Sequence, residues 1–146
     1  MRRIALSVAG RRLVFDLGAP LAEVSAELDG FDLKTVDVPD APRRYLLLRG
    51  HGVELLFKED VLAAVVLHID DQGAGVFRGA IDGVSGDVLV HPDEAGFVAA
   101  LQALGFERLE RRYPFAVDML DAELRMRLEQ RPGNRMILID DGARVR

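Results

Sequence analysis

The chain has 146 residues, of which 49% are apolar and 29% are charged, and it contains no cysteine and no tryptophan. These values predict one folded domain over residues 1–146, and they exclude a disordered chain, a collagen-like chain and a disulfide-rich scaffold. The formal net charge is −5, so the chain as a whole lacks the basic charge that is typical of nucleic-acid-binding proteins.

The N-terminal residues predict a β-hairpin. Ala9-Gly10 suits a tight turn, with residues 12–15 as the returning strand. The apolar run before this turn is too short for a signal peptide, and Arg11-Arg12 interrupts it. Nowhere does the chain approach the roughly 18 consecutive apolar residues that cross a membrane. We therefore expect a soluble, cytoplasmic protein.

Two helices are predicted, one from Pro20 to Gly30 and one from Pro92 to Gly105. Proline suits the first position of a helix, because its missing N–H would be unpaired there in any case. Glycine is typical of the residue just after a helix. Both segments also carry apolar residues at helical spacing, which predicts one buried face on each helix.

Short apolar runs separated by polar turns predict antiparallel strands over the rest of the chain. The glycine-rich segment 73–86 contains Phe77 as a predicted strand residue, and Val88-Leu89-Val90 is predicted as a further short strand. The other expected strands cover residues 45–48, 53–57, 61–69, 107–112, 123–129 and 136–139.

The two predicted helices and the strands after them are alike. Each helix is followed by Gly-Phe, and residues 54–58 correspond to residues 123–127. This pattern predicts two helix-then-strands units, at about 20–70 and 92–141, within a single α+β domain built on antiparallel sheet. Neither unit alone would bury enough apolar surface to be stable.

The acidic excess lies in the middle of the chain. Residues 50–105 hold nine acidic and two basic residues, whereas residues 1–49 and 106–146 each carry a net charge of +1. Solvated turns would explain this pattern, and so would a negative surface that steers a basic partner. On the second interpretation the candidate charge partners are Glu54, Glu59, Asp60, Asp70, Asp71, Asp82 and Asp87. Phe77 would be either an aromatic anchor or a core residue.

Motifs for catalysis are lacking in the sequence. His68 and Asp70 fall on one face of a predicted strand and could form half of a metal site, but a structural histidine or an exposed pair at the strand end is the favoured interpretation. Acidic pairs such as Asp70-Asp71 lie at predicted strand ends, where turns favour them. We therefore expect no enzymatic activity, no cofactor and no metal.

Four segments together resemble a known class of protein. They are GVELLF at 52–57, VLAAVVL at 61–67, FRGAIDGV at 77–84 and the helix-ending LG at 104–105. This arrangement resembles small bacterial immunity proteins, which are encoded beside polymorphic or contact-dependent toxins. Phe77 stands where those proteins usually have tyrosine.

The resemblance implies an antitoxin that binds and neutralises a cognate toxin domain by stoichiometric association. The partner would be a toxin that acts in the cytoplasm, for example a basic nuclease, and neither nucleic acid nor a membrane would be bound. The alternative interpretation is a non-enzymatic structural protein that associates with itself through exposed sheet edges.

Overall fold

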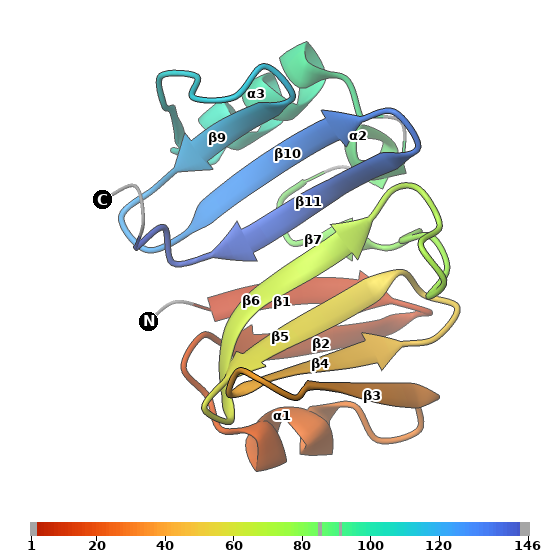
Figure 1. Ribbon diagram of the computed structural model, residues 1–146. Helices are drawn as coiled ribbons and strands as arrows, with labels where there is room; N and C mark the ends of the chain where they lie inside the picture. Colours follow the sequence, from red (N-terminus) through yellow and green to blue (C-terminus); the bar gives the residue numbers. More distant parts are fainter. Residues whose placement is uncertain (1–2, 85, 91, 144–146) are drawn as a thin grey trace.

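The computed structural model describes residues 3–84, 86–90 and 92–143, and over these ranges the chain forms two antiparallel sheets and three helices (Figure 1). The predicted α+β class is confirmed. The large sheet contains, in order across it, β3 (Leu33–Val38), β4 (Arg43–Leu48), β5 (Val53–Lys58), β6 (Val61–His68), β11 (Asn134–Asp140), β10 (Arg125–Arg131), β9 (Ala116–Leu120) and β8 (Glu107–Arg108). The small sheet contains β2 (Arg11–Asp16), β1 (Arg3–Val8) and β7 (Ala80–Ile81). The helices are α1 (Leu21–Glu27), α2 (Gly86–Val90) and α3 (Glu94–Ala103).

The predicted N-terminal hairpin is present as β1 and β2. Val8 lies opposite Arg11, so Ala9 and Gly10 form a two-residue turn. Both turn residues have positive φ, 51° for Ala9 and 78° for Gly10, which is the backbone that a right-handed strand twist favours in such turns. Among the described residues, no helix has the length and apolar character needed to cross a bilayer.

The large sheet is assembled from two four-stranded meanders. Strands β3 to β6 follow α1, and strands β8 to β11 follow α3. The last strands of the two meanders, β6 and β11, pair with each other, and Leu67 lies opposite Ile137. Residues 54–58 lie on β5 and residues 125–127 of the corresponding segment lie on β10, so both segments reach the third strand of their meander. The relation between the two units as repeats stays a prediction.

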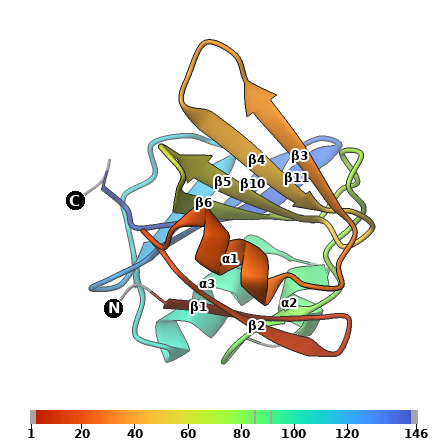
Figure 2. The same cartoon turned by 90° about the horizontal axis from the view of Figure 1, so that it is seen from below.

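The core lies between the large sheet on one side and the helices and the small sheet on the other. Figure 2 shows the helices and the small sheet together on one side of the large sheet. Alternate residues of β5, namely Val53, Leu55 and Phe57, are fully buried on that side, and they belong to one apolar cluster with Phe97 and Leu101 of α3. No helix of the described chain covers the opposite face of the large sheet, which we call the outer face.

Three predicted elements were wrong in detail. Residues Val88–Val90 belong to α2 and not to a strand, and Leu89 of this helix is buried in the core. Phe77 lies outside the strands, although its ring is buried in the core. The strand predicted over 107–112 is only the two-residue β8, and the chain then leaves the sheet and returns as β9, which was not predicted.

Candidate functional site

The outer face carries charged side chains among apolar ones. Because side chains alternate along a strand, every second residue of each strand points away from the core. One row of directly opposed residues across this face is Leu47, Glu54, Val66, Leu138, Arg127 and Asp118. The half of the row on β11, β10 and β9 thus brings an arginine and an aspartate side by side.

A groove of about 660 Å³ crosses the outer face. Its floor includes Leu56 of β5, Ala64 of β6 and Leu138 of β11. Arg43 of β4 lies toward one end, and Tyr113 from the loop between β8 and β9 lies toward the other. Four strand spacings separate β4 from β10 in the sheet, so the groove extends over about 19 Å.

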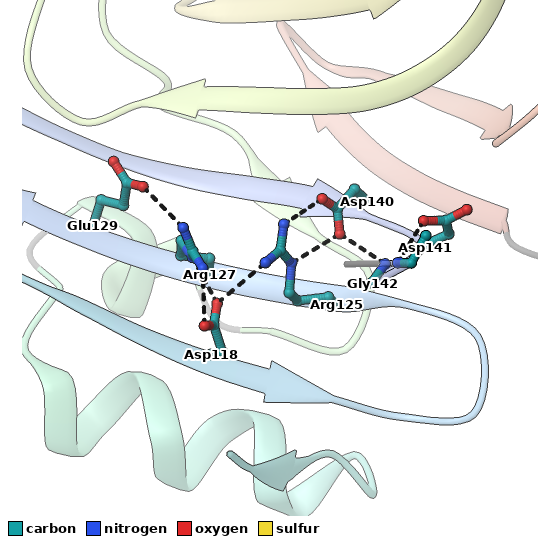
Figure 3. A network of polar contacts seen from close by, with 8 residues as sticks. Asp118, Arg125, Arg127, Glu129, Asp140, Asp141 and Gly142 are labelled. Carbon is teal, nitrogen blue, oxygen red and sulfur yellow. Dashed lines mark hydrogen bonds and ion pairs between the residues drawn. The ribbon is translucent and has the colours of Figure 1, made fainter. Parts of the chain in front are cut away.

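A network of ion pairs forms the β10 side of the groove (Figure 3). Asp118 accepts hydrogen bonds from Nε and Nη2 of Arg127 at 2.7 and 3.0 Å. Arg125 donates from Nε to Asp140 at 2.9 Å, pairs with it again through Nη2, and has Nη1 3.9 Å from Asp118. Glu129 lies 3.5 Å from Nη1 of Arg127. The two arginines are therefore held in fixed positions by carboxylates on three strands.

The centre of the network is buried although it lies on the outer face. The side chains of Asp118 and Arg125 are each only 6% exposed. Tyr113 covers part of the network, with its ring centroid 5.5 Å from the Arg127 guanidinium, at a distance typical of a cation–π contact. The hydrogen bonds to Asp118 raise the pKa of Arg127, so this side chain stays charged. Both arginines are already paired with carboxylates, which makes the network a rigid wall of the groove.

Two hydrogen bonds hold residues 140–143 beside this wall. Asp140 accepts a hydrogen bond from the N–H of Gly142, and Asp141 accepts one from the N–H of Ala143, both at 2.9 Å. These bonds hold Asp141 and Ala143 where they line the groove.

Three basic residues that line the groove have no carboxylate partner among the described residues. Within the described part of the chain, Arg43, Lys58 and Arg112 form no ion pair. Arg43 and Lys58 lie directly opposite each other on β4 and β5. The groove thus combines an apolar floor with basic side chains that are free to contact a ligand.

No match is found among known protein families, curated proteins or solved structures. The described residues also contain no group of three or more His, Asp and Glu side chains that could hold a metal ion. His68 and Asp70, considered above as half of a metal site, have different partners. Nε2 of His68 lies 3.4 Å from Glu54, whereas Asp70 pairs with Arg135.

Two of the acidic residues predicted as partner contacts, Asp70 and Asp71, accept hydrogen bonds within the chain. Asp70 accepts hydrogen bonds from Nη2 and Nε of Arg135 at 2.8 and 3.0 Å and from its backbone N–H at 2.9 Å, and these bonds lower the pKa of Asp70. Asp71 accepts from the N–H groups of Gly73 and Gly75, which lower the pKa of Asp71. These bonds order the turn after β6.

The other predicted contacts lie elsewhere. Glu54 is on the outer face, and Asp82 pairs with Arg12 at 2.7 Å beside the small sheet. Glu59 and Asp60 form the turn between β5 and β6, about ten residues from Asp70, which corresponds to about 30 Å along β6. The predicted acidic residues therefore do not share one contiguous face.

The remaining two predicted contacts are Phe77 and Asp87. Phe77 is 2% exposed and packs in the core, so the core role is the one it has. Asp87 lies on α2, and its side chain is outside the described residues.

Sequence reasoning missed the groove, although one signal for it was present. Arg125, Arg127 and Glu129 alternate along a predicted strand, and a period of two places all three on one face. Charged residues on every outward position of a strand indicate a polar network there. Its partner Asp118 lies on β9, the strand that was not predicted.

Proposed function

We propose that the chain is a non-enzymatic binding protein of the immunity type, which neutralises a bacterial toxin domain by stoichiometric association. The observation that carries this proposal is the groove on the outer face, with its apolar floor. Val61 and Tyr113, which are 40% and 47% exposed, both line it. Exposed apolar and aromatic side chains around a preformed depression are typical of the centre of a protein–protein interface.

The rigidity of the groove wall supports association over turnover. Binding is weakened by the entropy lost when interface side chains become ordered. Arg125 and Arg127 are already ordered by Asp118 and Asp140 in the free protein. A partner that docks there would therefore lose less entropy than one that must order long, free side chains.

The test takes the products of the genes that flank the gene of this chain as candidate toxin domains. Isothermal titration calorimetry should give a 1:1 complex, and co-expression should relieve growth inhibition by the toxin. Val61→Glu places a charge at the groove and should weaken the affinity at least tenfold, which corresponds to about 1.4 kcal/mol. Val36→Glu is the matched control, because Val36 is 38% exposed but does not line the groove. Equal affinities of the two variants, or no complex at all, would contradict the proposal.

The second candidate function is self-association through β3. This strand forms one edge of the large sheet, and residues 34–37 are all exposed. An open edge of this kind offers unpaired backbone groups to another strand. Light scattering discriminates between the two functions: a concentration-dependent dimer that Val36→Pro abolishes would favour self-association, and a monomer would exclude it.

A further inference from the structure

We infer that the groove binds an extended, acidic segment of the partner, in which carboxylate side chains are combined with apolar ones. The inference rests on the proposed function and adds to it the surface that makes the contact and the chemistry of the segment bound there. It differs from the sequence-based expectation of an acidic surface that meets a basic partner.

The charges of the groove favour an anionic ligand. Five basic residues and two acidic residues line it, although the whole chain has a net charge of −5. Arg125 and Arg127 are matched by the carboxylates of the network. The charges that remain free are mainly positive, and they belong to Arg43, Lys58 and Arg112.

The placement of Arg43 and Lys58 adds an independent argument. Residues directly opposite on antiparallel strands have Cα atoms about 5 Å apart, and like charges in such positions are destabilising. Arg43 and Lys58 occupy this arrangement, and no described acidic side chain forms an ion pair with either of them. A carboxylate bound between them would relieve the repulsion, so a ligand rather than the fold provides the compensating charge.

The shape of the groove favours a chain segment over a small anion. Its extent of about 19 Å corresponds to about six residues of extended chain at about 3.3 Å each. A single phosphate would fill only the region near Arg43 and Lys58. It would leave the apolar floor at Leu56, Ala64 and Leu138 uncovered.

The binding test uses three fluorescein-labelled octapeptides of alternating sequence. Leucine alternates with glutamate in the first, with lysine in the second and with serine in the third. Fluorescence anisotropy measures affinity, and amide chemical shifts of the full-length protein locate the binding site. We expect the glutamate peptide to bind most tightly, to shift the amides of Leu56, Ala64 and Leu138, and to lose affinity as salt is raised.

Matched variants test the charges. Arg43→Glu combined with Lys58→Glu should weaken binding of the glutamate peptide at least tenfold, and the milder double glutamine variant should weaken it less. Arg49→Glu combined with Arg78→Glu is the control, because it changes the net charge equally at exposed residues that do not line the groove. Equal losses in the two double glutamate variants would overturn the inference, because they would indicate a general charge effect.

The remaining outcomes separate the inference from the proposed function. Tighter binding of the lysine peptide in the groove would overturn the acidic chemistry and leave the groove as the binding surface. The toxin domain could also bind with no effect of Val61→Glu and with no peptide bound in the groove. That result would overturn the groove as the surface that binds the toxin, and with it the acidic segment as the ligand of the groove. Inorganic phosphate that shifts the same amides as strongly as the peptide would identify a small-anion site instead.

Discussion

Replacing Asp118 with alanine removes the carboxylate on which Arg125 and Arg127 converge. Asp118 accepts two hydrogen bonds from Arg127, at 2.7 and 3.0 Å, and lies 3.9 Å from Arg125. Its side chain is only 6% exposed, so water has little access to take its place. Breaking a buried pair by removing one partner leaves an uncompensated charge and costs about 3–5 kcal/mol. We expect a loss of this size in the free energy of unfolding.

Urea unfolding followed by far-ultraviolet circular dichroism measures this loss. With a slope of about 2 kcal/mol per molar urea, the midpoint should fall by about 1.5–2.5 M. Asp82→Ala is the control, because it removes an aspartate from an exposed pair with Arg12, and such pairs contribute little. If the midpoint of Asp118→Ala falls no further than that of Asp82→Ala, the argument from burial is refuted.

A double variant separates the unpaired charge from lost packing. Asp118→Leu with Arg127→Met replaces a buried ion pair by apolar side chains, while Arg125 keeps its partner Asp140. The variant also removes two longer contacts, that of Arg127 with Glu129 at 3.5 Å and that of Arg125 with Asp118 at 3.9 Å. Replacements of a buried ion pair by apolar side chains are often neutral. The double variant should therefore be more stable than Asp118→Ala. A double variant as unstable as Asp118→Ala would show that the geometry of the pair, and not its charge balance, stabilises the sheet.

Three other predictions concern stability outside the network. Ala9→Gly should raise the free energy of unfolding by up to about 1 kcal/mol, because the φ of 51° at Ala9 is strained for alanine and not for glycine. The control Ala99→Gly, in the middle of α3, should lower the free energy of unfolding by about as much. Urea midpoints of the two variants that shift in the same direction would contradict the strain argument. Arg135 holds the pKa of Asp70 below its ordinary value, so Asp70 stabilises the fold above the unfolded pKa of about 3.9 and loses this effect as the pH falls through the lower folded value. Asp70→Asn should therefore lower the melting temperature at pH 7 and reduce its decline below about pH 4, and an unchanged acid limb would argue against this linkage. Asp93→Ala removes the N-cap of α3, whose carboxylate accepts the N–H of Gly96 at 2.6 Å, and should cost about 1 kcal/mol in urea unfolding, with Asp93→Asn retaining most of the stability.

The elements that the sequence could predict are those specified by local chemistry. Helix α1 begins one residue after Pro20, and α3 begins two residues after Pro92. The turn at Ala9-Gly10 joins β1 and β2 as expected. In each case a few neighbouring residues decide the backbone, so no information about the rest of the fold is needed.

The elements that the sequence could not predict depend on distant neighbours. Strand β9 has only five residues and carries Asp118 at its centre, which local propensity disfavours in a strand. It forms because β10 pairs with it, and because Arg127 of that strand neutralises the aspartate. The alternation of Arg125, Arg127 and Glu129 places them on one face, but only the packing of the helices determines that this face is the outer one.

The chain has a negative net charge and yet a basic groove, because acidic side chains that lie far from the groove have little effect on the potential inside it. At physiological salt, charges further apart than about 8 Å are largely screened from one another. Asp70 and Asp71 lie beyond the far end of β6 from Lys58, and they are bound by Arg135 and by backbone N–H groups. Their charges are therefore largely screened from the groove, which is lined by the basic side chains of Arg43, Lys58 and Arg112. On the inference drawn above, the register of β4 and β5, which places Arg43 opposite Lys58, determines what the groove binds, and the net charge of the chain does not.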